Sequence, residues 1–139
     1  MDAAAARARF AAARVARLAT VGAEGRPHLV PMVFAVDGDT NYSAVDDKPK
    51  ATPRLRRLAN IAANPHVALL ADHYDDADWT GLWWVRADGT ARPVEPAAEP
   101  AARARALLAA RYAQYRDAPP AGTVIVVTVT RWSGWAAAG

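Results

Sequence analysis

The sequence contains no cysteine among its 139 residues. This absence excludes disulfide bonds, zinc–thiolate sites and thiol nucleophiles. Continuous apolar segments are short, and none approaches the ~18 residues that a membrane-spanning helix needs. The arginine-rich N-terminus, MDAAAARARFAAARVARLA, has no continuous apolar centre and no recognisable cleavage site, so we expect a helix of the mature protein rather than a signal peptide. These absences lead us to expect a cytoplasmic protein.

Common catalytic motifs are missing as well. The sequence has no Gly-x-Gly-x-x-Gly, no phosphate-binding P-loop and no Gly-x-Ser-x-Gly. His28, His66 and His73 lie far apart without metal-ligand spacing, and the acidic segment 72–78 lacks the spacing of a calcium loop. We therefore expect no metal site. Either the protein is not an enzyme, or a bound cofactor carries its reaction.

The length fits a single domain spanning residues 1–139. Many of the apolar residues are alanine, which contributes little to burial, so the core must depend on valine, leucine, isoleucine and the five tryptophans. An association interface would add to the buried surface of such a chain. The net charge of +3 is modest for a protein that binds nucleic acid.

Apolar periodicity and turn residues predict a mostly β fold with helices. The expected helices cover 2–17, 53–63 and 96–116, and the expected strands cover 18–23, 28–36, 40–45, 66–71, 82–94 and 123–130. Most strands follow one another as hairpins, which favours a small antiparallel barrel carrying helices. Pro31 indicates an edge strand or a bulge because proline cannot donate to a ladder, and Asp88–Gly89 predicts a bulge in the long fifth strand.

A basic segment joins the third strand to the second helix. It contains Lys48, Lys50, Arg54, Arg56 and Arg57. A strand, a basic loop and a helix N-terminus together suit the binding of a phosphate or another anion. A solvated basic face is the alternative interpretation. Nucleic-acid binding is a third, which the localised charge and the low net charge oppose.

The tryptophans form a second noteworthy group. Trp83 and Trp84 are adjacent on a strand, so they should point to opposite faces, one of them toward the core. Trp132 and Trp135 follow the last expected strand. These side chains either belong to the core and a dimer interface or line the site of a flat aromatic cofactor.

Several segments, in order along the chain, carry a family resemblance. A-T-V-G-A-x-G-R-P, L-V-P-M-V-F, N-Y-S-A and L-A-N-I-A-A-N-P-H-V-A-L-L resemble the split β-barrel flavin-binding proteins typified by pyridoxamine 5'-phosphate oxidase, over residues 17–135. K-P-K, R-L-R-R-L-A-N-I, L-W-W-V-R-A-D-G and R-W-S-G-W resemble an actinobacterial subgroup of oxidoreductases that depend on coenzyme F-420, a deazaflavin. The implied fold is a six-stranded antiparallel split β-barrel, FMN-binding-protein-like, that forms a homodimer with the cofactor at its interface.

The resemblance also implies the cofactor-binding residues. They are the second-strand residues Val30, Pro31, Met32 and Val33 against the ring, Tyr42, Ser43, Arg56 and Arg57 near the phosphate, Lys50 as a further anion contact, and Trp84, Trp132 and Trp135 as candidate aromatic walls. Two departures favour a deazaflavin over FMN. Val30 and Ala35 stand where the oxidases carry arginine and lysine, and the segment that closes over pyridoxal phosphate has no counterpart here.

The implied function is hydride transfer between the deazaflavin and an unidentified organic substrate, with neither nucleic acid nor membrane as a partner. One alternative keeps the fold and takes FMN as the cofactor. A second is a non-catalytic protein that binds or carries the cofactor. The residues do not choose a proton donor among Tyr42, His28 and a bound water.

Overall fold

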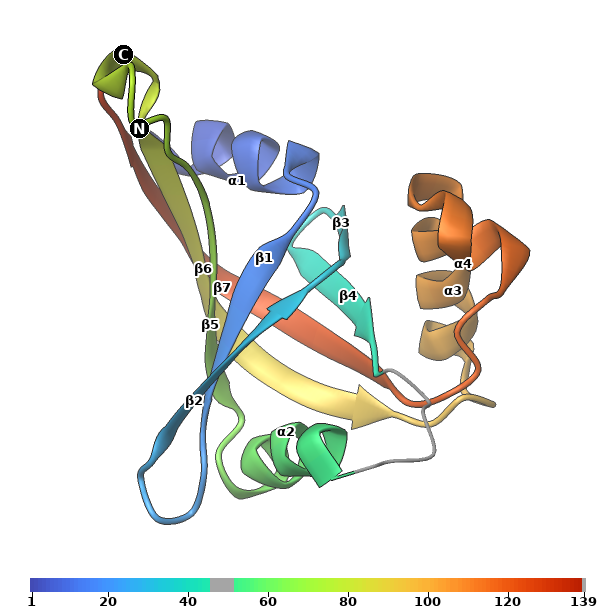
Figure 1. Cartoon of the computed structure of the whole chain (residues 1–139). Helices are drawn as coiled ribbons and strands as arrows, with labels where there is room; N and C mark the ends of the chain where they lie inside the picture. The colour runs from blue at the N-terminus through green and yellow to red at the C-terminus, as the bar shows by residue number, and fades with distance from the viewer. Residues whose placement is uncertain (46–51, 139) are drawn as a thin grey trace.

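A computed structural model describes residues 1–45 and 52–138 as an α+β fold built on one antiparallel sheet (Figure 1). The strands are β1 (Ala16–Val21), β2 (Pro27–Met32), β3 (Ala35–Asp37), β4 (Thr40–Ala44), β5 (His66–His73), β6 (Trp83–Val94) and β7 (Val124–Ala136). They follow the order β2-β1-β5-β6-β7-β4-β3, and all neighbours are antiparallel. The helices are α1 (Ala3–Ala12), α2 (Thr52–Ala63), α3 (Glu99–Arg111) and α4 (Ala113–Asp117), with a 3-10 turn η1 (Trp79–Gly81).

The described residues thus contain seven strands, so the expected count of six was wrong. The single strand expected over 28–36 is divided into β2 and β3. The helix expected over 96–116 is likewise divided, with Tyr112 between α3 and α4, and α1 ends at Ala12 rather than at residue 17. Four other elements confirm the prediction closely, namely α2, β4, β5 and β6.

The side chains of Tyr112 and Arg111 lie at all three places where the observed elements differ from the expected ones. The Tyr112 hydroxyl accepts a hydrogen bond from the Phe34 N–H at 3.2 Å and lies 3.0 Å from the carbonyl oxygens of Phe34 and Arg14. The Arg111 guanidinium donates to the carbonyls of Ala11, at 2.7 Å, and Ala13. Backbone groups that a longer strand or helix would pair are therefore satisfied by these two side chains.

The main core lies inside the curved sheet, and α1 and α2 lie at opposite ends of it (Figure 1). Phe10 of α1 packs against Phe34 and Trp132, with ring centroids 4.8 and 5.5 Å apart, and Ile61 of α2 is also buried in this core. A second, smaller core lies outside the sheet, where α3 packs Ala101, Ala104 and Leu107 over β4 and β7. The helices thus cover separate surfaces.

The two longest strands, β6 and β7, pair with each other along their length within the sheet. Their register shifts between Asp88 and Gly89, which confirms the predicted bulge. A Cβ on Gly89 would lie 2.2 Å from the Thr128 carbonyl oxygen, so the close approach of the two backbones requires glycine. β7 continues to Ala136, six residues beyond the expected end of the strand.

No helix within residues 1–45 and 52–138 is long and apolar enough to cross a membrane.

Candidate functional site

A cluster of polar side chains lies where α2 packs against β1. Asn60 is buried and donates from Nδ2 to the Thr20 hydroxyl at 3.1 Å. Thr20 faces His28 across the β1–β2 ladder. Arg57 precedes Asn60 by three residues, so both lie on the same face of α2. We call Thr20, His28, Arg57 and Asn60 the α2 polar cluster.

Two buried nitrogen atoms of this cluster, Arg57 Nε and His28 Nδ1, have no hydrogen-bond partner among the residues that the structure describes. Burial lowers the pKa of Arg57 from its ordinary value, because desolvation disfavours the charged guanidinium. An unpaired buried donor costs about 1–3 kcal/mol, and an anion that supplied an acceptor would recover that energy. The α2 polar cluster therefore fits a negatively charged group.

The predicted ring-contacting residues lie on β2 and just after it. β2 forms one edge of the sheet, so Pro31 occupies the edge position that proline favours. Met32 is buried, Val30 packs against the main core, and Pro31 is exposed on the opposite face. Val33 is half-buried between β2 and β3. An edge strand leaves backbone N–H and C=O groups unpaired along one side, and a heterocycle can bind there.

The other predicted phosphate contacts are more dispersed. Tyr42 belongs to the second core beneath α3, whereas Ser43 is buried on the opposite face of β4. Arg56 is exposed on α2. Lys50, like its neighbour Lys48, lies outside the described residues. The structure therefore brings Arg57 to the cluster and leaves Tyr42 on a different surface.

The tryptophans divide between the two faces of the sheet. Trp132 is buried in the main core, and its Nε1 donates to Asp39 Oδ1 at 2.8 Å. Trp83 packs against the same core from a partly buried position. Trp84 and Trp135 face each other across the β6–β7 ladder on the outer side, where Trp135 is 48% exposed.

This outer side is an open apolar surface. Its cross-strand rows run from β7 through β6, β5 and β1 to β2, and they include Trp84, Trp135, Arg86, Leu70, Arg17, Pro31 and Leu29. None of these residues belongs to either core, and Leu29 and Leu70 are 66% and 39% exposed. We call this surface the open face.

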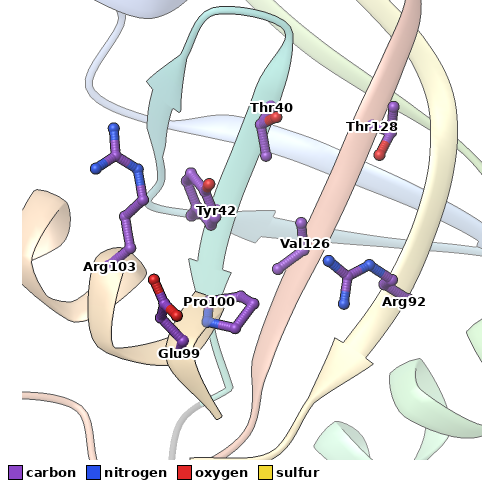
Figure 2. Close-up of a pocket in the computed structure, with 8 residues that line it drawn as sticks. All are labelled: Thr40, Tyr42, Arg92, Glu99, Pro100, Arg103, Val126 and Thr128. Carbon is purple, nitrogen blue, oxygen red and sulfur yellow. The ribbon is translucent and has the colours of Figure 1, made fainter.

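A pocket of about 290 Å³ lies further along the outer side of the sheet, between α3 and β4, β6 and β7 (Figure 2). Its lining residues are Thr40, Tyr42, Arg92, Glu99, Pro100, Arg103, Val126 and Thr128. Reasoning from the sequence singled out only Tyr42 among them. It also missed Asn60 and Thr20, for which the only signal was the three-residue spacing between Arg57 and Asn60.

Comparisons with known proteins agree with this architecture. The family model for pyridoxamine 5'-phosphate oxidase matches residues 3–136. A 5a,11a-dehydrotetracycline/5a,11a-dehydrooxytetracycline reductase of Streptomyces rimosus is 39% identical over 56 residues, which cover 40% of this chain and 38% of the reductase. The match thus spans well under half of that enzyme.

Solved structures share the fold at low sequence identity. A FAD-binding protein from Mesorhizobium loti superposes with a TM-score of 0.73 at 19% identity, covering 96% of this chain and 94% of that one. The heme storage protein of Vibrio cholerae gives 0.72 at 18% identity, with 98% and 95% coverage. A FAD-binding protein from Mycobacterium smegmatis gives 0.63 at 20% identity, with 97% and 94% coverage.

Proposed function

Because this chain belongs to the pyridoxamine 5'-phosphate oxidase family, we propose that it is an oxidoreductase that binds coenzyme F-420 and transfers a hydride between this deazaflavin and an organic substrate. The observation that carries the proposal is the buried Nε of Arg57, which has no partner in the α2 polar cluster. The partial match to a reductase supports a redox role.

In this proposal Arg57 binds an acidic group of the cofactor. Its guanidinium donates charge-assisted hydrogen bonds, which are roughly twice as strong as neutral ones. Asn60 holds Thr20 and so keeps β1 against α2, which fixes the position of the cluster. The unpaired backbone edge of β2, with Val33 after it, would hold the ring. The bound deazaflavin supplies a carbon that donates or accepts a hydride.

The open face is the proposed homodimer interface. Its exposed Leu29, Leu70 and Trp135 are covered when a second copy packs against it. The same association encloses the edge strand β2 and excludes water from the ring. Low water content strengthens the electrostatic interactions at the site. His28, whose Nδ1 is buried and unpaired in the same cluster, is the described residue best placed to hold a proton there.

The proposed arginine contacts with the cofactor can be tested by changing both Arg56 and Arg57 to alanine. We expect deazaflavin binding to weaken by about 1.5–3 kcal/mol for each charge-assisted contact that is lost. Arg116→Ala removes one arginine charge from α4 and should leave the affinity unchanged. An unaltered dissociation constant in the double variant would rule out the phosphate role of these arginines. Circular dichroism checks that all three proteins are folded.

Two alternatives to the proposed function can each be tested by experiment. FMN as the cofactor is the first, and a yellow protein that retains FMN on purification would support it. A carrier without turnover is tested by mixing the protein with reduced deazaflavin and a panel of quinone and enone acceptors. Oxidation no faster than in the absence of protein, for every acceptor, would favour the carrier.

A further inference from the structure

The pocket beside α3 has a floor formed by two cross-strand rows. One row contains Arg92, Val126 and Tyr42, and the next contains Thr128 and Thr40, from β6, β7 and β4. Neighbouring strands lie about 4.8 Å apart, so Arg92 and Tyr42 are about 10 Å apart across β7. The first turn of α3 forms the wall on the Tyr42 side (Figure 2).

The charged side chains of the pocket differ in what they already bind. Arg103 is held by Asp37, to which its Nε donates at 3.1 Å. Arg92 and Glu99 form no ion pair or hydrogen bond within the described part of the chain, and both are exposed. Figure 2 shows Arg92 and Arg103 on opposite sides of the floor formed by Tyr42 and Val126. Arg92 thus offers all its donors to a ligand in the pocket.

From this arrangement we infer that the pocket binds a small organic carboxylate that also carries an amino or hydroxyl group. The planar guanidinium of Arg92 matches a carboxylate with two parallel hydrogen bonds. The hydroxyls of Thr40 and Thr128 can both donate and accept, as a ligand hydroxyl requires. Glu99 accepts a hydrogen bond from an ammonium or hydroxyl group.

The charge balance argues against a polyanion. Two arginines and one glutamate line the pocket, and Asp37 neutralises Arg103 just beyond it. A second negative charge on the ligand would therefore face Glu99 without a free cation to pair with. The pocket also lies on the outer side of the sheet, separate from the α2 polar cluster. The inference therefore does not depend on the proposed cofactor.

Nuclear magnetic resonance of the full chain, labelled with ¹⁵N, tests the inference through the Nε–H signal of Arg92. The probes are L-serine, lactate, succinate and ethanolamine, each at constant ionic strength. We expect serine and lactate to shift the signal saturably, and ethanolamine, which has no carboxylate, to leave it unchanged. Arg92→Gln should weaken serine binding at least tenfold, as followed by the Thr40 and Thr128 amides. Arg26→Gln, which removes a charge from the exposed β1–β2 turn, should not.

The glutamate supplies an independent check. Succinate should bind more weakly than lactate to the native protein, and Glu99→Gln should bring its affinity up to that of lactate. Shifts that rise linearly without saturation, or that are equal in the native protein and Arg92→Gln, would overturn the assignment. Stronger binding of succinate than of serine to the native protein would overturn the proposed ligand class.

Discussion

Tyr112 shows how one side chain sets the limits of several elements. Its hydroxyl accepts from Phe34 N–H, receives a bond from Arg111 Nε at 3.1 Å, and lies beside two carbonyl oxygens. The Arg14 guanidinium lies over its ring, 4.6 Å from the centroid. The hydroxyl thus connects the start of β1, the gap between β2 and β3, and the end of α3.

Tyr112→Phe should therefore destabilise the protein by about 1–3 kcal/mol, because the Phe34 N–H loses its partner while part-buried. Urea unfolding followed by tryptophan fluorescence measures this change. Tyr74→Phe is the matched control, since the Tyr74 hydroxyl bonds only the exposed Asp76, at 2.8 Å. A loss no larger than that of the control would show that the Tyr112 hydroxyl does not hold these elements together.

Asp39 gives stability a dependence on pH. The Trp132 Nε1–H and then the Arg7 guanidinium, by hydrogen bonds, lower its pKa below 3.8. A carboxyl whose pKa is lower in the folded state stabilises the protein fully above its unfolded value, and this contribution disappears as the pH falls through the folded pKa. Native protein should thus lose more stability than Asp39→Asn between pH 5 and pH 2. Parallel urea midpoints for the two proteins across this range would contradict the assignment.

At the scale of elements, the sequence predicted those bounds of helices and strands that depend on the local residue pattern. The proline at the start of α2, the apolar spacing along it and Asn64–Pro65 at its end led to nearly correct bounds for that helix. Gly89 located the bulge. The breaks at Phe34 and Tyr112 could not be predicted, because they arise from hydrogen bonds between residues 78 positions apart.

The candidate site likewise contains residues that local sequence predicted and contacts between distant residues that it could not predict. Arg57 was predicted from a resemblance in a continuous segment, whereas the Asn60–Thr20 contact joins residues 40 positions apart. Tyr42 and Ser43 were assigned together because the family resemblance implies a pair of phosphate contacts there, yet strand alternation separates their side chains. The α3 pocket depends on the register of three strands that are distant in sequence, so no local pattern indicates it.

A substitution at the bulge tests the close packing of β6 against β7. Gly89→Ala should destabilise the protein by about 3 kcal/mol or more, because the new Cβ would meet the Thr128 carbonyl oxygen at 2.2 Å and force the strands apart. Gly81→Ala is the control, since its Cβ would meet its nearest neighbour, His73, at an ordinary 3.9 Å. Thermal unfolding measures both variants. Equal melting temperatures for the two would refute the close-packing explanation.

At the scale of the whole molecule, the proposed function couples the open face to the proposed cofactor site. Leu29→Arg places a charge on the β2 side of the proposed interface, so it should convert the proposed dimer into monomers and weaken cofactor binding at the same time. Ala106→Arg, on the exposed side of α3, should change neither. Analytical ultracentrifugation gives the mass of each protein. A native protein that is already monomeric at micromolar concentration would refute the interface.

The proposed function requires the α2 polar cluster to bind a deazaflavin. The most direct measurement is a side-by-side titration of the native protein with coenzyme F-420 and FMN, followed by tryptophan fluorescence. We predict saturable quenching by the deazaflavin at a concentration at least tenfold below that needed for FMN, and a loss of this preference when Arg56 and Arg57 are both alanine. Tighter binding of FMN, or no saturable binding of the deazaflavin, would contradict the claim.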